Sequence, residues 1–202
     1  MPNTIESALG SSSRAGALSR RSGSVVFGVV IFIASEVMFF GGLISGFFVL
    51  RAGSAFWPPP GQPRLPVLVT AFNTVMLLAS ALTMYRALQQ AQRDRWQASG
   101  RWMVVTMLLG AGFLASQGRE WVRLVGFGLT ARSSVYGALF YTIVGAHGLH
   151  VAGALVALLF VFGRLRRGAY SAANHEGLTA CWIYWAFVVW LWPIIYVTVY
   201  LS

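Results

Sequence analysis

A single carboxylate lies deep inside the first long apolar stretch of the sequence. Glu36 is the only charged residue between Val25 and Leu50, and the rise of a helix places it about 16 Å into that stretch. An ionised carboxylate near the centre of a bilayer costs at least about 2.5–3.5 kcal/mol, which protonation, a polar neighbour, a partner chain or water would relieve. Two interpretations of Glu36 stay open: a protonated group hydrogen-bonded within a helix bundle, or a group that couples to a proton or to a partner protein.

Two histidines share one face of a later apolar stretch. His147 and His150 lie three residues apart within Gly-Ala-His-Gly-Leu-His, so a helix places both side chains on the same side. This spacing would permit a metal ion, but a di-iron bundle needs Glu-x-x-His motifs on paired helices, and the remaining histidine, His175, falls in a predicted loop. Because glycine and alanine surround the pair, we expect close helix packing in which the imidazoles hydrogen-bond across the contact, and no metal site.

The other polar and aromatic candidates have structural interpretations. Asn73, Gln117 and Glu120 are expected to join the two histidines in a polar network inside the bundle, with Glu120 paired to Arg123 one helical turn away. Four aromatic residues are interpreted as anchors at the membrane–water interface, with core packing as the alternative for the second of them: Trp57, Trp185, Trp192 and Tyr196. We predict no catalytic residue and no redox or metal cofactor in this chain, whose one cysteine is Cys181.

The composition of the 202-residue chain is that of an integral membrane protein. Hydrophobic residues make up 57% of it and charged residues only 10%, against about 25% charged residues in ordinary soluble chains. All 15 basic residues are arginine, and with 5 acidic residues they give a net charge of +10. In so apolar a chain, this charge favours orientation in a membrane over nucleic-acid binding. Soluble enzymes, secreted disulfide-bonded modules and disordered proteins are excluded.

Five apolar stretches approach or exceed the roughly 20 residues that a membrane helix needs. The third is the shortest, and we expect its helix to continue through the charged residues that follow it. The sequence therefore predicts an all-α, polytopic membrane protein, a bundle of five transmembrane helices at about residues 25–50, 67–88, 102–125, 135–163 and 178–201.

The arginines predict how this bundle is oriented. Five crossings put ten arginines on the side of the N-terminus and five on the other side, so the positive-inside rule places the N-terminus in the cytoplasm and the C-terminus outside. Residues 1–23 are rich in Ser, Gly, Ala and Arg, and are predicted to be a flexible cytoplasmic tail and not a cleaved signal peptide. Residues 24–202 are predicted to form one transmembrane domain.

Five sequence motifs, in order along the chain, resemble those of subunit III of the haem-copper terminal oxidases, the cytochrome c oxidase type. They are Ile-Phe-Ile-Ala-Ser-Glu-Val-Met-Phe-Phe around Glu36, the Trp57-Pro58-Pro59 loop, Phe72-Asn73-Thr74 followed by Leu77-Leu78-Ala79-Ser80, the Gln117 and Glu120 pair, and Gly145–Val151. The last helix departs from the mitochondrial-like pattern, because Ala186 and Val189 stand where that pattern has His and Asp. The resemblance runs from about Phe27 to Tyr200 and indicates a short, five-helix bacterial form.

The resemblance implies a non-catalytic subunit of a proton-pumping oxygen reductase in the bacterial inner membrane. The haems and copper would lie in partner subunits I and II. This chain would pack on subunit I, bind phospholipid, and support proton uptake and stability during turnover, with subunit II, small subunits or a respiratory supercomplex as further partners. Glu36 would lie near a lipid cleft and the contact with subunit I. A quinol oxidase or nitric oxide reductase subunit, an independent proton-coupled transporter and an intramembrane metalloenzyme at the histidine pair remain as alternatives.

Overall fold

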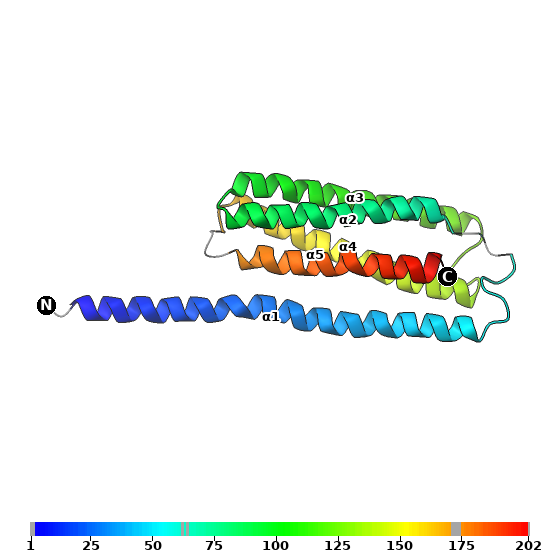
Figure 1. Cartoon of the computed structure of the whole chain (residues 1–202), viewed down its shortest axis with the longest axis horizontal. Coiled ribbons are helices and arrows are strands. Elements are labelled where there is room, and N and C mark those ends of the chain that lie inside the picture. Colours follow the sequence, from blue (N-terminus) through cyan, green and yellow to red (C-terminus); the bar gives the residue numbers. More distant parts are fainter. Residues whose placement is uncertain (1–2, 62, 64, 171–174, 202) are drawn as a thin grey trace.

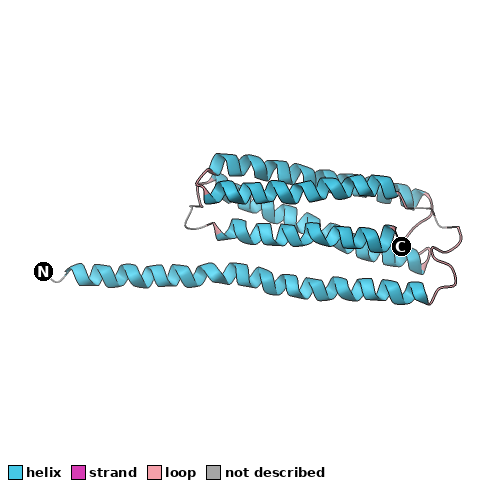
Figure 2. Ribbon diagram, viewed as in Figure 1, coloured by secondary structure: helices cyan, strands magenta, loops and turns pink. Residues whose placement is uncertain are grey.

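Five long helices build the protein. The computed structural model describes residues 3–61, 63, 65–170 and 175–201, with side chains from residue 24 onward. Within these ranges every regular element is helical (Figure 2). The elements are α1 (Asn3–Ala52), α2 (Val67–Gln92), α3 (Trp96–Gly126), α4 (Val135–Arg166) and α5 (Glu176–Ile195), followed by the π-helical turn η1 (Tyr196–Tyr200). The predicted all-α fold of five helices is confirmed.

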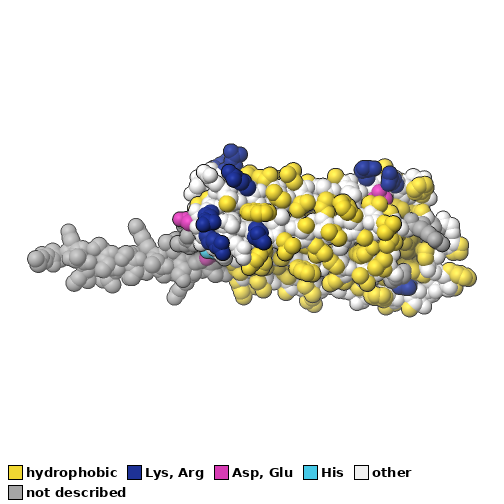
Figure 3. Space-filling view, turned by 45° about the horizontal axis from the view of Figure 1, so that its top comes forward, with side chains coloured by type: hydrophobic (Ala, Val, Ile, Leu, Met, Phe, Trp, Pro, Cys, Tyr) yellow, Lys and Arg dark blue, Asp and Glu magenta, His cyan; other side chains and the backbone are white. Residues whose placement is uncertain are grey.

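The helices run antiparallel to one another in chain order, so the two ends of the chain lie at opposite ends of the bundle (Figure 1). Each of the five is long and apolar enough to cross a membrane, counting α1 from Ser24 and α5 together with η1. Figure 3 shows the corresponding surface, a broad apolar belt with arginine side chains gathered towards its two ends. A bilayer requires this distribution, because charged groups must lie outside its hydrocarbon core.

Helix α1 lies along one side of the bundle, against α5 and, over a smaller area, α4 (Figure 1). Among its described side chains only Phe40 and Phe47 are buried, whereas large apolar residues such as Met38 are exposed. Helices α2 to α5 pack more closely around a common core. The first span is therefore the one whose surface depends most on lipid or on another chain.

Residues 3–23, most of the predicted flexible tail, continue the backbone of α1, and the helix begins at Asn3. No proline follows Pro2 before Ala52, and extending an existing helix costs much less than nucleating a new one. The flexibility of residues 1–23 stays a prediction.

Local sequence explains several helix ends. Ser134 caps α4, because its Oγ accepts a hydrogen bond from the backbone N–H of Gly137 at 3.0 Å. The turn between α2 and α3 places Asp94 at a φ of 60°, and the indole Nε1 of Trp96 donates to its carboxylate at 2.7 Å. Near the other end of α5, Pro193 lacks the N–H that would bond to the preceding turn, and the chain goes on as the π-helical turn η1.

Candidate functional site: the polar contacts between the spans

Glu36 on α1 meets His150 on α4. The carboxylate Oε2 lies 2.8 Å from the imidazole Nε2, and the two side chains are 14% and 19% exposed, respectively. The ring of His150 also packs edge-on against Phe40, one turn beyond Glu36, with centroids 5.2 Å apart. His150 is thus a polar neighbour of Glu36 inside the span. Their contact links α1, the least buried span, to the rest of the bundle.

The second ring nitrogen of His150 limits the protonation states of this pair. Nδ1 lies 2.6 Å from the carbonyl oxygen of Ala146. Since a carbonyl oxygen can only accept a hydrogen bond, Nδ1 carries a hydrogen. Nε2 is then the ring nitrogen that faces the carboxylate of Glu36. The contact places a polar group beside Glu36 inside the span, where a lone carboxyl group would be costly.

His147 has different surroundings, although it is on the same helix face. Its ring is fully buried, stacks on the indole of Trp192 with centroids 4.9 Å apart, and packs edge-on against Phe113. Neither ring nitrogen has a hydrogen-bond partner among the described residues. The interhelical hydrogen bond that we predicted for both histidines is therefore present as a polar contact for His150 only. The prediction for His147 is wrong, because aromatic rings from α3 and α5 surround it.

The three other members of the predicted polar network are all buried, but they do not form one network. The Nε2 of Gln117 donates to the hydroxyl of Tyr200 at 2.8 Å, which ties α3 to the end of the chain. Glu120 forms the predicted ion pair with Arg123, at 3.0 Å. The side-chain amide of Asn73 is 1% exposed and has no partner in the described part of the chain.

Two of the four predicted interface anchors lie in the core instead. Trp185 and Trp192 are 1% and 0% exposed. Their indole N–H groups donate to hydroxyls of α2, Trp185 to Ser80 at 3.1 Å and Trp192 to Thr74 at 2.9 Å. The anchor interpretation is wrong for both, since small hydroxyl residues on α2 leave room for the indoles and satisfy their donors.

Trp57 and Tyr196 are less buried and lie near the ends of helices. Trp57, in the loop after α1, packs edge-on between Phe47 and Tyr136 at centroid distances of 5.4 and 5.2 Å. The hydroxyl of Tyr196 donates to the carbonyl of Val67, the first residue of α2, at 3.2 Å. Both positions are compatible with the predicted anchoring role.

Several contacts between helices in the core were not predicted from the sequence. Thr83 and Thr106 share a 2.8 Å hydrogen bond between α2 and α3. At Gly110 on α3 there is no room for a side chain, because a Cβ atom would lie 2.6 Å from the indole of Trp185. The glycine and the hydroxyl residues are visible in the sequence, but their partners lie on other helices.

Among the described residues, no three His, Cys, Asp or Glu side chains converge in a way that could hold a metal ion. The Glu36–His150 pair brings an acidic side chain and a histidine within ion-pair distance inside the span.

Comparison with known proteins identifies the family of this chain. A model of the family described as "Cytochrome c oxidase subunit III" matches residues 15–202. The chain belongs to the cytochrome c oxidase subunit III family. The resemblance seen in the motifs is thus confirmed over nearly the whole length.

Relatives in this family are similar to the chain over most of their length. The chain is 35% identical over 181 residues to the probable cytochrome c oxidase subunit 3 of Mycobacterium leprae, covering 89% of each chain. It is 36% identical over 178 residues to cytochrome c oxidase subunit 3 of Synechocystis sp., covering 87% of this chain and 75% of the relative. It is 34% identical over 190 residues to the Corynebacterium diphtheriae protein of the same name, covering 93% and 92%.

The family motifs coincide with the contacts described above. Glu36 and His150 belong to two different motifs, and the structure brings them together. Ala186 and Val189, where the mitochondrial-like pattern has His and Asp, lie on α5. The polar partner of Glu36 in this subunit III chain is therefore supplied by α4.

Proposed function

We propose that the chain is the non-catalytic subunit III of a proton-pumping cytochrome c oxidase in the aerobic respiratory chain of a bacterium. It packs on subunit I, while the haems and copper are held by subunits I and II. It lies in the inner membrane with the N-terminus in the cytoplasm and the C-terminus in the periplasm. Its contribution is to sustain proton uptake and the stability of the complex during turnover, and to hold phospholipid.

The Glu36–His150 pair carries the proton part of this proposal. A 2.8 Å contact between a carboxylate and an imidazole holds one proton that either residue can carry. Each side chain keeps some exposed surface, 14% for Glu36 and 19% for His150, so a proton could pass to or from a neighbouring group or a water molecule. Glu36 lies on α1, the helix with the least buried surface, where a partner chain can reach it.

The exposure of α1 supports docking and lipid binding. Its outward surface consists of large apolar side chains, among them Phe27, Met38 and Val49, which are 66%, 79% and 70% exposed. Such a surface inside a membrane is covered by lipid chains, by another helix, or by both in different places. Subunit I and phospholipid are the occupants proposed here.

The proposal is tested by removing this chain from its oxidase. Because the redox centres would belong to other subunits, the depleted complex should retain haem and begin to reduce oxygen. It should then lose activity during turnover faster than the complete complex and pump fewer protons per electron. Adding back the wild-type chain should restore both properties. A depleted complex that sustains turnover and pumping at the complete complex's level would overturn the proposal.

A further inference from the structure

A cavity of about 450 Å³ opens between the start of α3 and the end of α4. This volume lies in the range of small-ligand pockets, roughly 300–1,000 Å³. Its walls include Trp96, Gly100, Arg101 and Val104 from α3, and Phe162 and Arg166 from α4. It is remote in sequence from Glu36 and His150 and belongs to the end of the bundle where α1 starts (Figure 1).

The spacing of the lining residues places them on one face of each of the two helices. Trp96, Gly100 and Val104 follow one another at four-residue intervals, as do Phe162 and Arg166, so each set lies along one helix face. Gly100 lies beside the ring of Phe162, because a Cβ atom there would be at van der Waals distance, 3.6 Å, from that ring. The lining residues are therefore held by the backbones of two spans and not by a loop.

The cavity has a charged end and an apolar end. Arg101 and Arg166 are exposed, and the guanidinium carbon of Arg166 lies 6.0 Å from the centroid of the Phe162 ring, a cation–π distance. Val104 is two helical turns further along than Trp96, about 12 Å towards the apolar belt. No carboxylate is among the described residues that line the cavity, and nearby Asp94 accepts its hydrogen bond from Trp96.

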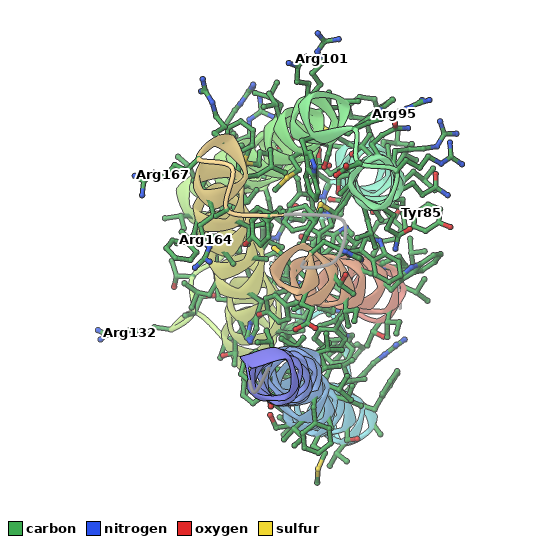
Figure 4. All side chains as sticks on the ribbon, turned by 90° about the vertical axis from the view of Figure 1, so that its left-hand side faces the viewer. Tyr85, Arg95, Arg101, Arg132, Arg164 and Arg167 are labelled. Atoms are coloured by element: carbon green, nitrogen blue, oxygen red, sulfur yellow. The ribbon has the colours of Figure 1, made fainter. Side chains whose placement is uncertain are left out.

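The surroundings strengthen the positive charge. Figure 4 looks onto this end of the bundle, with Arg95 and Arg101 near the start of α3 and Arg164 and Arg167 at the end of α4. Two exposed guanidinium groups above an apolar wall match an anion that is attached to hydrocarbon chains. A free phosphate ion would make no apolar contact with Val104 and Phe162. An apolar helix would bring no negative charge to the two arginines.

We propose that this cavity binds the headgroup of an anionic glycerophospholipid. Its phosphate lies between Arg101 and Arg166, and its acyl chains run along Val104 and Phe162 into the bilayer. The proposal deepens the lipid-binding part of the proposed function and rests on it for the membrane setting. It places a lipid on the face between α3 and α4, away from α1.

The test titrates the complex that contains this chain with phosphatidylglycerol carrying a photoreactive acyl chain, and maps the cross-linked peptides by mass spectrometry. Cross-links should fall on the peptides around Val104 and Phe162. Arg101→Gln combined with Arg166→Gln should weaken the apparent lipid affinity at these peptides about 30-fold, since each arginine near a membrane surface contributes about a fivefold factor. The matched control, Arg86→Gln with Arg93→Gln, removes two arginines that do not line the cavity, and should change the affinity less than about threefold because neither contacts the bound phosphate.

Three outcomes would overturn the proposal. The arginine pair in the cavity could have no larger effect than the control pair. Phosphatidylcholine of the same chains could compete as well as phosphatidylglycerol, which would mean an apolar groove only. Millimolar inorganic phosphate could displace the lipid, which would mean a free-phosphate site. Haem measured in the same preparations separates the proposals, because a wild-type chain without a haem-bearing partner would contradict the proposed function and still allow the lipid titration.

Discussion

Glu36 and His150 face one another across the contact between α1 and α4, and the carbonyl of Ala146 fixes the hydrogen on the far side of the imidazole. This arrangement explains how a carboxyl group is tolerated inside a membrane span without a metal or an arginine beside it. The two interpretations that the sequence left open, structural and proton-coupling, now predict different outcomes for one substitution.

Glu36→Gln should leave assembly intact and impair proton pumping. Glutamine has nearly the same shape and can still hydrogen-bond to Nε2 of His150, but it cannot release a proton. We expect the variant to enter the complex in wild-type amounts, with a reduced proton-to-electron ratio and a severalfold shorter active lifetime during turnover. Proton release from vesicles and oxygen consumption measure the two effects. Ser35→Ala, which alters an exposed neighbour, is the matched control. Failure of Glu36→Gln to enter the complex would assign the residue a structural role.

His147 should tolerate replacement by another aromatic ring. Its nitrogens have no hydrogen-bond partner in the described structure, and its contacts are the stack on Trp192 and the edge of Phe113. His147→Phe keeps an aromatic ring there and should change the free energy of unfolding by less than about 1 kcal/mol, whereas His147→Ala leaves a cavity that costs about 2–5 kcal/mol. Thermal unfolding in detergent distinguishes the two. Equal destabilisation by both variants would contradict this, because it would mean that a hydrogen bond of the imidazole nitrogens, and not the ring packing, stabilises the bundle.

Contacts between neighbouring residues could be predicted from the sequence, and contacts between helices could not. Glu120 and Arg123 lie one turn apart, so their ion pair follows from helix geometry alone. The hydrogen bonds of Gln117 with Tyr200 and of Trp192 with Thr74 join residues 83 and 118 positions apart. Nothing in one sequence says which helix faces which. The same lack of tertiary information led to the interface interpretation of Trp192 and left Trp185 open between the interface and the core, where both indoles lie.

At the scale of the helices, Gly110 on α3 leaves room for the Trp185 ring of α5. A Cβ atom would lie 2.6 Å from the Trp185 ring and 3.0 Å from Leu155. Gly110→Ala should therefore force Trp185 out of position and destabilise the bundle by about 1–3 kcal/mol. Gly118→Ala, on the same helix, is the matched control, because a Cβ atom there meets nothing within 4 Å, and the alanine should be neutral or slightly stabilising. Equal unfolding temperatures for the two variants would contradict the described packing.

The helices themselves were predictable, but their ends were less so. Hydropathy identifies the apolar part of a span, so the existence and order of five helices followed from the sequence. Helix α3 begins at Trp96 and α2 ends at Gln92, beyond the predicted limits of 102 and 88. Most of the additional residues are polar or charged, and they extend existing helices at little cost. For the same reason α1 begins at Asn3.

At the scale of the whole molecule, five antiparallel helices put the two termini at opposite ends (Figure 1). The described arginines at the end where α1 starts outnumber those at the other end, as the positive-inside rule requires for a cytoplasmic N-terminus. Tags at both termini should therefore differ in accessibility in intact spheroplasts. A protease added outside should remove a C-terminal tag and spare an N-terminal one. Loss of both tags or of neither would contradict an odd number of crossings, and loss of the N-terminal tag alone would reverse the orientation.

We propose that the chain acts as one part of a larger enzyme. Its described residues offer the Glu36–His150 pair and exposed apolar helix faces, which suit contact with other subunits. The most direct test is to purify the tagged chain from native membranes in mild detergent and record the visible spectrum and the stoichiometry of haem. We predict that haem and copper co-purify with the chain in a fixed ratio, together with oxygen-reducing activity that uses cytochrome c. A colourless chain that is stable alone, with no haem-bearing partner at any detergent concentration, would contradict it.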